Sequence, residues 1–262
     1  MYSASLDEGL DRPLTPLRNP LKSGKHGAQL LSCCNGLIWL GNSQHDLALW
    51  NPFTRSYKRI PAESVEKSNG LSDICHYSYG FGQESTRNDY TVVSITQFGR
   101  DIHGPPVTYE VKLYSLRSNC WRTVQGFPYL GYFVSRVGCF ANDALHWLLT
   151  KYSSSGKDVK LVAFNLGKEE FQELTLPMYT ESFDPSFLVV LQGCLCVLAK
   201  DSGCKLTIYA MKQYGARESW TKLCTIGNGD VPGVLECVWP LMYSKKGDKL
   251  LLVENLQDLI WL

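Results

Sequence analysis

Short runs of alternating hydrophobic and polar residues, separated by turn residues, cover most of the chain. The pattern is clearest in residues 32–61, where leucine or tryptophan takes every second position of two short runs, as in half-buried strands. Asn35-Gly36 favours a tight hairpin turn, because both residue types tolerate positive φ. Asn51-Pro52 ends the next strand, because proline has no N–H for a strand ladder. This stretch therefore predicts a four-stranded antiparallel meander.

The same meander recurs along the chain. We expect further units at about 76–124, 137–177 and 187–223, and a fifth that begins near 237 and breaks off within 258–262. An aromatic residue begins the fourth strand of each full unit, and the last three are 50 and 49 residues apart: Tyr57, Trp121, Phe171 and Trp220. A four-stranded unit repeated every 40–50 residues is typical of a propeller blade.

Stacking explains why such a unit would repeat. A single meander buries its faces poorly, whereas blades stacked around an axis cover both faces and leave few exposed edges. A large β-sandwich is the alternative, but it would not require an aromatic residue at this period. We therefore predict an all-β, kelch-like β-propeller of about four and a half blades over residues 28–262, incomplete at both ends.

Residues 1–27 are predicted to be irregular, because three prolines interrupt them. Residues 2–6 could form a short strand left over from a blade. Our hypothesis is that this strand pairs with residues 258–262 and closes the ring.

Composition narrows the function further. The 262 residues carry a net charge of +1, so we expect neither a nucleic acid nor a membrane as partner. Ten cysteines include no C-x-x-C pair, and no histidine stands at ligand spacing from one, so no metal site is predicted. A disulfide scaffold is the alternative, although it suits short secreted chains. The chain starts with no signal peptide and has no apolar run that could span a bilayer, which predicts a cytoplasmic or nuclear protein, or both.

Motifs for catalysis are missing from the sequence. There is no H-E-x-x-H, G-x-S-x-G or P-loop, so we predict no catalytic residue, no cofactor and no enzyme activity. A propeller hydrolase with paired axial carboxylates is the alternative. Its candidate acids stand mostly in predicted turns, where they would bind local backbone: Asp89, Asp143, Glu169 and Asp201. His146 lies inside a strand, which favours a core histidine over a catalytic one.

Seven stretches in one order resemble the plant F-box-associated domain, the propeller-like part of many F-box and F-box/kelch proteins. They are SCCNGLIWL (32–40), LWNPFTRSYKRIP (49–61), YGFGQESTRNDYTVV (79–93), VKLYSLRSNCWRTV (111–124), ALHWL (144–148), VAFNLGKEEFQELTLP (162–177) and YAMKQYGARESWTKL (209–223). The resemblance implies a kelch-like propeller that recognises a protein target for an SCF-type ubiquitin ligase.

Two features depart from that family. The sequence contains no F-box, the helical segment with which family members bind a Skp-type adaptor and its cullin, and it stops within a blade. We therefore expect the adaptor and cullin as partners only if an F-box lies upstream. The alternative is a free or dominant-negative binder, or a fragment without function.

Loops on one rim of the ring are the best candidates for binding the unknown target, because a rigid scaffold positions them. The loop at 127–133 is unusually aromatic for a connection, and with a nearby arginine it has the composition of a protein-binding hot spot. Residues 178–183 form the next loop between blades and are expected to face the same partner. The alternative is that these rings pack beneath the blades. The predicted binding residues are Tyr129, Tyr132, Phe133, Arg136, Tyr179 and Phe183.

Overall fold

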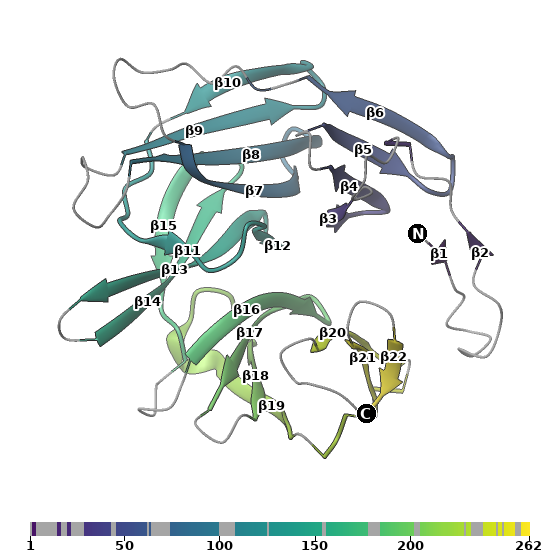
Figure 1. The fold of residues 1–262 in the computed structure, drawn as a ribbon, viewed down its shortest axis with the longest axis vertical. Coiled ribbons are helices and arrows are strands. Elements are labelled where there is room, and N and C mark those ends of the chain that lie inside the picture. Colours follow the sequence, from purple (N-terminus) through teal and green to yellow (C-terminus); the bar gives the residue numbers. More distant parts are fainter. Residues whose placement is uncertain are drawn as a thin grey trace.

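The computed structural model of the chain consists of antiparallel sheets that follow one another as the five blades of a β-propeller (Figure 1). It describes residues 2–3, 15–16, 20–21, 29–42, 46–61, 63, 74–99, 108–124, 126–153, 156–177, 184–201, 205–227, 229–231, 238–244, 246–247, 249–254 and 258–262. No α-helix occurs in these ranges, and none of their segments is a helix that could cross a membrane. The predicted all-β propeller is confirmed.

Each blade is a meander whose strands lie in chain order from the axis outward. Blade 1 contains β3 (Gln29–Cys34), β4 (Leu37–Gly41), β5 (Leu47–Asn51) and β6 (Ser56–Ile60); blade 2 contains β7 (Ile74–Glu84), β8 (Asp89–Phe98), β9 (Thr108–Ser115) and β10 (Cys120–Val124). Blade 3 contains β11 (Tyr132–Phe133), β12 (Cys139–Ala141), β13 (Ala144–Ser153), β14 (Gly156–Asn165) and β15 (Glu170–Leu174). Blade 4 contains β16 (Asp184–Leu191), β17 (Cys194–Lys200), β18 (Leu206–Met211) and β19 (Trp220–Ile226), with a 3-10 turn, η2 (Arg217–Ser219), before β19; blade 5 contains β20 (Val238–Tyr243), β21 (Leu250–Glu254) and β22 (Asp258–Trp261).

The first hairpin of three blades closes through two residues that both have positive φ. These pairs are Asn35-Gly36 (48° and 77°), Asn142-Asp143 (49° and 56°) and Gln192-Gly193 (49° and 76°). Positive φ at both positions gives the turn a twist that matches the flanking strands. The tight turn expected at Asn35-Gly36 is confirmed.

Two of the repeated aromatic residues link neighbouring blades by a hydrogen bond. The indole Nε1 of Trp121 donates to the carbonyl oxygen of Pro61, which follows the last strand of blade 1, at 2.8 Å. Trp220 repeats the contact, and its Nε1 donates to the carbonyl of Thr175, which follows the last strand of blade 3, also at 2.8 Å. The period of the aromatic residues therefore reflects contact between successive blades.

The other two repeated aromatic residues have different surroundings. Phe171 has no donor and packs instead edge-on against Phe127, with ring centroids 5.0 Å apart. Tyr57 belongs to the first blade and is 52% exposed. The face of blade 1 that points away from blade 2 is covered by Leu21, which is buried in a small cluster with Leu40 and Trp50. A piece of the N-terminal segment thus covers a face that another blade would otherwise cover.

The N-terminal strand does not take the partner that the sequence suggested. β1 (Tyr2–Ser3) pairs with β2 (Thr15–Pro16), on the side of the ring between blades 1 and 5 (Figure 1). Within the described residues, β22 pairs with β21 and with no N-terminal strand. The hypothesis that residues 2–6 pair with 258–262 is therefore wrong for Tyr2–Ser3, which pair with β2 instead, and residues 4–6 lie outside the described residues.

Candidate protein-interaction site

The loop chosen from its aromatic composition, residues 127–133, is part of the connection 126–138 between β10 and β12. We call this whole connection the aromatic loop, and it is held at both ends. Its short strand β11 pairs with β13. The Tyr109 hydroxyl donates to the carbonyl of Gly131 at 2.7 Å and accepts from its N–H at 3.3 Å. Gly131 has φ of 148°, and a Cβ there would lie 2.9 Å from the backbone oxygen of Thr150, so only glycine fits.

The second half of the aromatic loop crosses to the neighbouring blade. Val137 forms a parallel bridge with Tyr79 on β7, supported by a 2.9 Å bond from the Tyr79 N–H to the Arg136 carbonyl. Gly138 meanwhile lies against Trp147 of its own blade, since a Cβ there would lie 2.5 Å from the indole. Consequently the first strand of blade 3, predicted to begin at 137, is split into β11 and β12.

Phe133 proves to be a core residue. It is 6% exposed and packs against Phe127 and Trp147, with ring centroids 5.4 and 6.3 Å apart. Its other side stacks on the imidazole of His76 at 6.1 Å with an interplanar angle of 6°. Phe133 therefore anchors the aromatic loop, and its removal would damage the fold as well as any binding surface.

The remaining predicted residues of the aromatic loop reach its surface to different degrees. Tyr129 and Tyr132 are half-buried, and the Tyr129 ring lies 5.6 Å from that of Phe127. Arg136 is exposed. Leu130 is 60% exposed and forms an apolar tip. The alternative of rings packed beneath the blade therefore holds for part of the loop only.

Two of the predicted binding residues remain to be placed, and two residues of the site were not predicted. Tyr179 and Phe183 lie outside the described residues, so their expected role stays a prediction. Sequence reasoning missed Leu130 and His76 as members of the site. Only the conformation of the loop decides which of its side chains points outward, and His76 reaches the loop from β7, far away in sequence.

Charge around the aromatic loop is sparse. Burial lowers the pKa of His76, and the positive charge of Arg136 lowers it further, so the imidazole is neutral at pH 7. Burial also raises the pKa of Tyr129, with a smaller effect from Glu173. Arg136 forms no ion pair with any residue that the structure describes. It is therefore a cation available to a partner.

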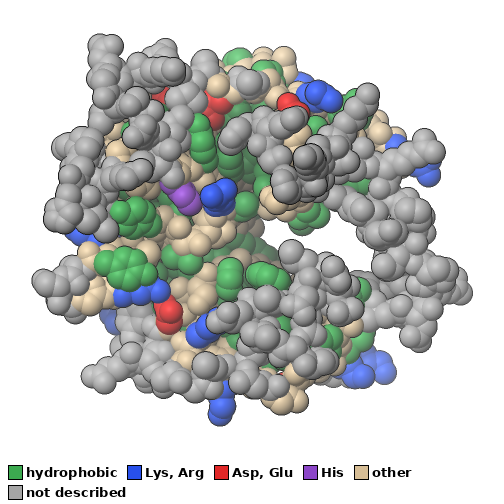
Figure 2. Space-filling view, viewed as in Figure 1, with side chains coloured by type: hydrophobic (Ala, Val, Ile, Leu, Met, Phe, Trp, Pro, Cys, Tyr) green, Lys and Arg blue, Asp and Glu red, His purple; other side chains and the backbone are tan. Residues whose placement is uncertain are grey.

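A cavity of about 560 Å³ lies on the axis of the ring, next to the aromatic loop. Its walls come from the inner strands of blades 1, 4 and 5 and from residues 134–135, 137–140 and 146–148. Three of its hydrophobic side chains are well exposed: Leu30 (54%), Val190 (37%) and Leu241 (48%). Figure 2 shows hydrophobic side chains along this inner wall. None of the described lining residues is Asp, Glu, Lys or Arg.

The residues that line the axial cavity test the hydrolase alternative. It requires at least two carboxylates around the axis, and the described lining of the axial cavity has none. His146 lines the cavity but is fully buried, with Nδ1 3.1 Å from the Cys139 carbonyl and Nε2 2.7 Å from the Tyr214 hydroxyl. Both ring nitrogens are engaged, as expected of a core histidine. No group of three or more His, Cys, Asp or Glu among the described residues could hold a metal.

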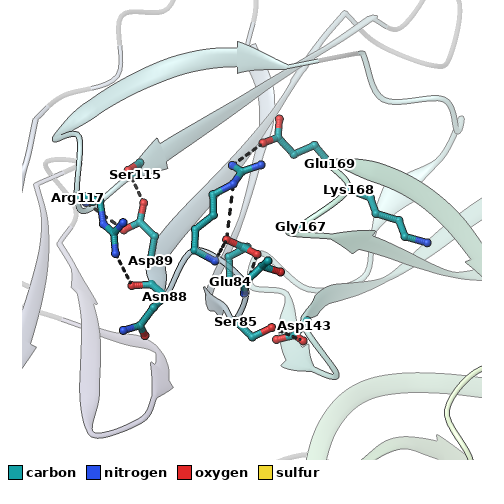
Figure 3. Close-up of polar contacts among 12 residues, drawn as sticks. Glu84, Ser85, Asn88, Asp89, Ser115, Arg117, Asp143, Gly167, Lys168 and Glu169 are labelled. Carbon is teal, nitrogen blue, oxygen red and sulfur yellow. Dashed lines mark hydrogen bonds and ion pairs between the residues drawn. The ribbon is translucent and has the colours of Figure 1, made fainter.

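Acidic residues outside the cavity instead bind turns, among them Glu84, Asp89 and Asp143 (Figure 3). Glu84, 3% exposed, accepts the backbone N–H groups of Thr86 at 2.9 Å and Arg87 at 2.8 Å. Burial alone would raise the pKa of Glu84, but these bonds and the Arg87 charge lower it. Arg122 binds the carboxylate of Glu169 on blade 3, and Arg87 reaches the same carboxylate at 3.4 Å. Both arginines lower the pKa of Glu169.

Two further acids act in the same way. Asp89 accepts the Ser115 hydroxyl at 2.5 Å and the backbone N–H of Arg117 at 3.0 Å. Asp143 on blade 3 accepts the hydroxyl of Ser85 on blade 2 at 2.8 Å (Figure 3). These carboxylates join turns and blades, as the turn positions of the acids predicted.

Comparison with known proteins gives a consistent result. Residues 11–255 match the F-box associated beta propeller domain family. The F-box protein CPR1 of Arabidopsis thaliana is 32% identical over all of this chain and 66% of its own length. An F-box/kelch-repeat protein of the same plant is 31% identical over 84% of this chain and 57% of its own length. The chain thus spans less than two thirds of these relatives. Among solved structures, dipeptidyl peptidase 4 of Porphyromonas gingivalis aligns with a TM-score of 0.44 and 8% identity, covering 91% of this chain and 43% of that one.

Proposed function

Because the chain belongs to the family of F-box associated β-propeller domains, we propose that it recognises a target protein on behalf of an SCF-type ubiquitin ligase. The observation that carries the proposal is the pairing of a rigid propeller with an open, uncharged axial cavity. Rigid walls and exposed apolar side chains are what a protein-binding surface needs, since little entropy is lost on binding.

The aromatic loop supplies the rest of the proposed surface. Leu130 offers an exposed apolar tip, Tyr129 and Tyr132 flank it, and Arg136 adds an exposed cation. Tyrosine and arginine are enriched in binding hot spots, and Leu130 adds exposed apolar surface beside them. Phe133 contributes by positioning these residues from the core. Tyr179 and Phe183 would extend the surface from the next loop.

A ligase role also needs an adaptor. In this proposal an F-box segment, present in a longer form of the protein, binds the Skp-type adaptor and cullin while the propeller binds the target. Without such a segment the propeller would bind its target and protect it, as a free or dominant-negative binder. We expect the protein to act in the cytoplasm or nucleus, where such ligases meet their targets.

One experiment separates these roles. The chain and a fusion of the chain behind an F-box segment are expressed in plant cells, captured proteins are identified, and their half-lives are measured. We expect both forms to capture the same proteins, with shorter half-lives in cells that express the fusion and longer ones with the chain alone. Captured proteins whose half-lives respond to neither form would overturn the ligase role.

A matched pair of variants tests the surface. Leu130→Asp combined with Arg136→Glu should lose capture at an unchanged melting temperature. Tyr152→Asp places one negative charge, as Leu130→Asp does, on a 65% exposed aromatic residue of β13 outside the cavity lining, and should capture as well as the original chain. Equal capture by both variants would exclude the aromatic loop from the binding surface.

A further inference from the structure

The axial cavity has a second property besides its apolar walls, namely open strand edges. In the described part of the chain, β3 pairs only with β4, β16 only with β17, and β20 only with β21. Each of these inner strands contributes residues to the cavity wall. Each therefore presents one edge whose backbone N–H and C=O groups are unused within its own sheet. Such edges bind extended peptide segments by adding a strand.

Charge restricts what can enter. The described wall carries no Asp, Glu, Lys or Arg over about 560 Å³, and a charged group placed there would lose its hydration without gaining a counter-ion. Apolar side chains gain most from such a site, because Leu30, Val190 and Leu241 would lose their remaining contact with water.

The open shape of the cavity favours a peptide segment over a small molecule as its ligand. Pockets for small ligands usually enclose most of the ligand surface. Here the three apolar wall residues are still between 37% and 54% exposed, so the walls do not close around an occupant. An extended segment that enters the cavity and continues beyond it fits this shape, and its backbone can use the open strand edges.

A cation lies beside one part of the cavity wall. Arg136 is exposed and lies between Ser135 and Val137, both of which line the cavity. It has no ion-pair partner among the described residues. A carboxylate of a bound segment beside Arg136 would form a charge-assisted pair with the guanidinium.

We propose that the axial cavity binds an extended peptide segment with an uncharged core of bulky apolar residues and an acidic residue at the Arg136 end. This rests on the proposed function, because the segment would belong to the target protein. It adds the chemistry by which the target is selected.

The test selects a phage-displayed library of random dodecapeptides on the immobilised chain, and then measures the affinity of enriched peptides by fluorescence polarisation. We expect enriched peptides to share an uncharged apolar core and a terminal Asp or Glu. Val190→Lys, at an exposed wall position, should weaken these peptides at least tenfold. Arg136→Glu should weaken them severalfold and shift selection towards Lys or Arg at that end, a change of preference that general destabilisation cannot produce.

The matched control is Tyr152→Lys, which adds a lysine to an exposed aromatic position outside the cavity and should change affinity less than twofold. All variants should keep the melting temperature of the original chain. Charged cores in the enriched peptides, unchanged affinity in Val190→Lys, or no enrichment at all would overturn the proposal.

The two proposals fail separately. If peptides do not bind while captured proteins still change half-life, only the cavity as the binding site is excluded. If peptides bind as described but no half-life changes, the cavity is a peptide site and the ligase role falls.

Discussion

Two neighbouring interfaces of the ring, between blades 2 and 3 and between blades 1 and 2, are filled by different chemistry. Blades 2 and 3 meet through buried hydrophobic side chains that extend along both sheets. From β8 and β9 these are Val93, Ile95, Val111 and Leu113, and from β13 and β14 they are Leu145, Trp147, Leu149, Val162 and Phe164. The aromatic loop closes this interface with Phe127 and Phe133.

The face of blade 2 that points to blade 1 is apolar at one end only. Its first cross-strand row, Phe81, Val92 and Tyr114, packs in an apolar cluster with blade 1. The next two rows are polar by register: Tyr79, Ser94 and Lys112, followed by Tyr77, Thr96 and Glu110. Lys112, with a side chain 5% exposed, lies 3.0 Å from Glu110 and 3.9 Å from Glu63, which follows β6.

The apolar and the polar interface contribute differently to the fold. Apolar faces stabilise by burial but can pack against each other in several relative positions. A buried lysine between two carboxylates is stable in only a few of these positions. Burying these charges costs hydration, so the polar rows add less stability than hydrophobic residues would. We infer that they fix how blade 1 docks on blade 2.

The largest effect is expected from breaking the polar rows. Lys112→Met should lower the free energy of unfolding by about 3 kcal/mol at pH 7, because Glu63 and Glu110 then face each other without their cation. Burial already raises the pKa of Glu63, opposed by Ser94 and Lys112. Without Lys112 that pKa rises further, so Glu63 takes up a proton on folding.

Urea denaturation of both proteins at several pH values tests this. A carboxyl group whose pKa is raised on folding makes the folded protein less stable as the pH rises. The loss of unfolding free energy in Lys112→Met should therefore be smaller at pH 5 than at pH 7. Lys168→Met removes the same charge from an exposed turn and should cost less than about 0.5 kcal/mol. A Lys112→Met variant as stable as the original chain at pH 7 would show that the polar rows do not hold the blades.

The interface between blades 3 and 4 sharpens the comparison, because its buried polar group is neutral. The Cys139 carbonyl can only accept, so Nδ1 of His146 carries the proton and Nε2 accepts from the Tyr214 hydroxyl. Burial lowers the pKa of His146 to about 4, from an ordinary value near 6.5. The unfolded chain therefore binds a proton in this range that the folded chain does not.

Stability should then fall as the pH falls. The loss begins below pH 6.5 and should reach about 2 kcal/mol at pH 5, measured by urea denaturation. His146→Asn should flatten this dependence. His76, whose pKa is also lowered by burial, contributes less because it is only half-buried. His76→Gln should therefore keep most of the slope. An unchanged slope in His146→Asn would assign the effect to other groups.

Local patterns were sufficient to predict the blades. Alternation marked the strands, Asn35-Gly36 marked a turn, and the recurring aromatics marked the repeat, because each signal depends on residues close in sequence. The split first strand of blade 3 was not predictable from them. Residues 136–138 could pair with either blade, and the backbone contacts that bind them to Tyr79 on β7 leave no trace in their own sequence.

The site was harder to predict for a related reason. The aromatic loop was found by composition, but its own sequence does not show that Phe133 points into the core and Leu130 outward. The axial cavity combines residues from four blades, with Leu30 and Leu241 at opposite ends of the chain. No local pattern marks residues that meet only when the ring forms.

The smallest expected effect concerns the repeated indole bonds, which occur at the two interfaces with buried polar groups, between blades 1 and 2 and between blades 3 and 4. Trp121→Phe keeps an aromatic ring but removes the donor to the Pro61 carbonyl, and should lower the free energy of unfolding by about 1 kcal/mol. Trp220→Phe should cost a similar amount at the blade 3–4 interface. The two losses should add within about 0.5 kcal/mol in the double variant, because the sites share no partner.

Tyr57→Phe is the matched control, since it removes a polar group from the same repeat position where no preceding blade lies among the described residues. It should change stability by less than about 0.5 kcal/mol. Suppose instead that Tyr57→Phe costs as much as Trp121→Phe. The polar group would then act within its own blade, and the recurrence of the aromatics would reflect the meander alone. A loss confined to Trp121 and Trp220 would tie the repeat to the contact between blades.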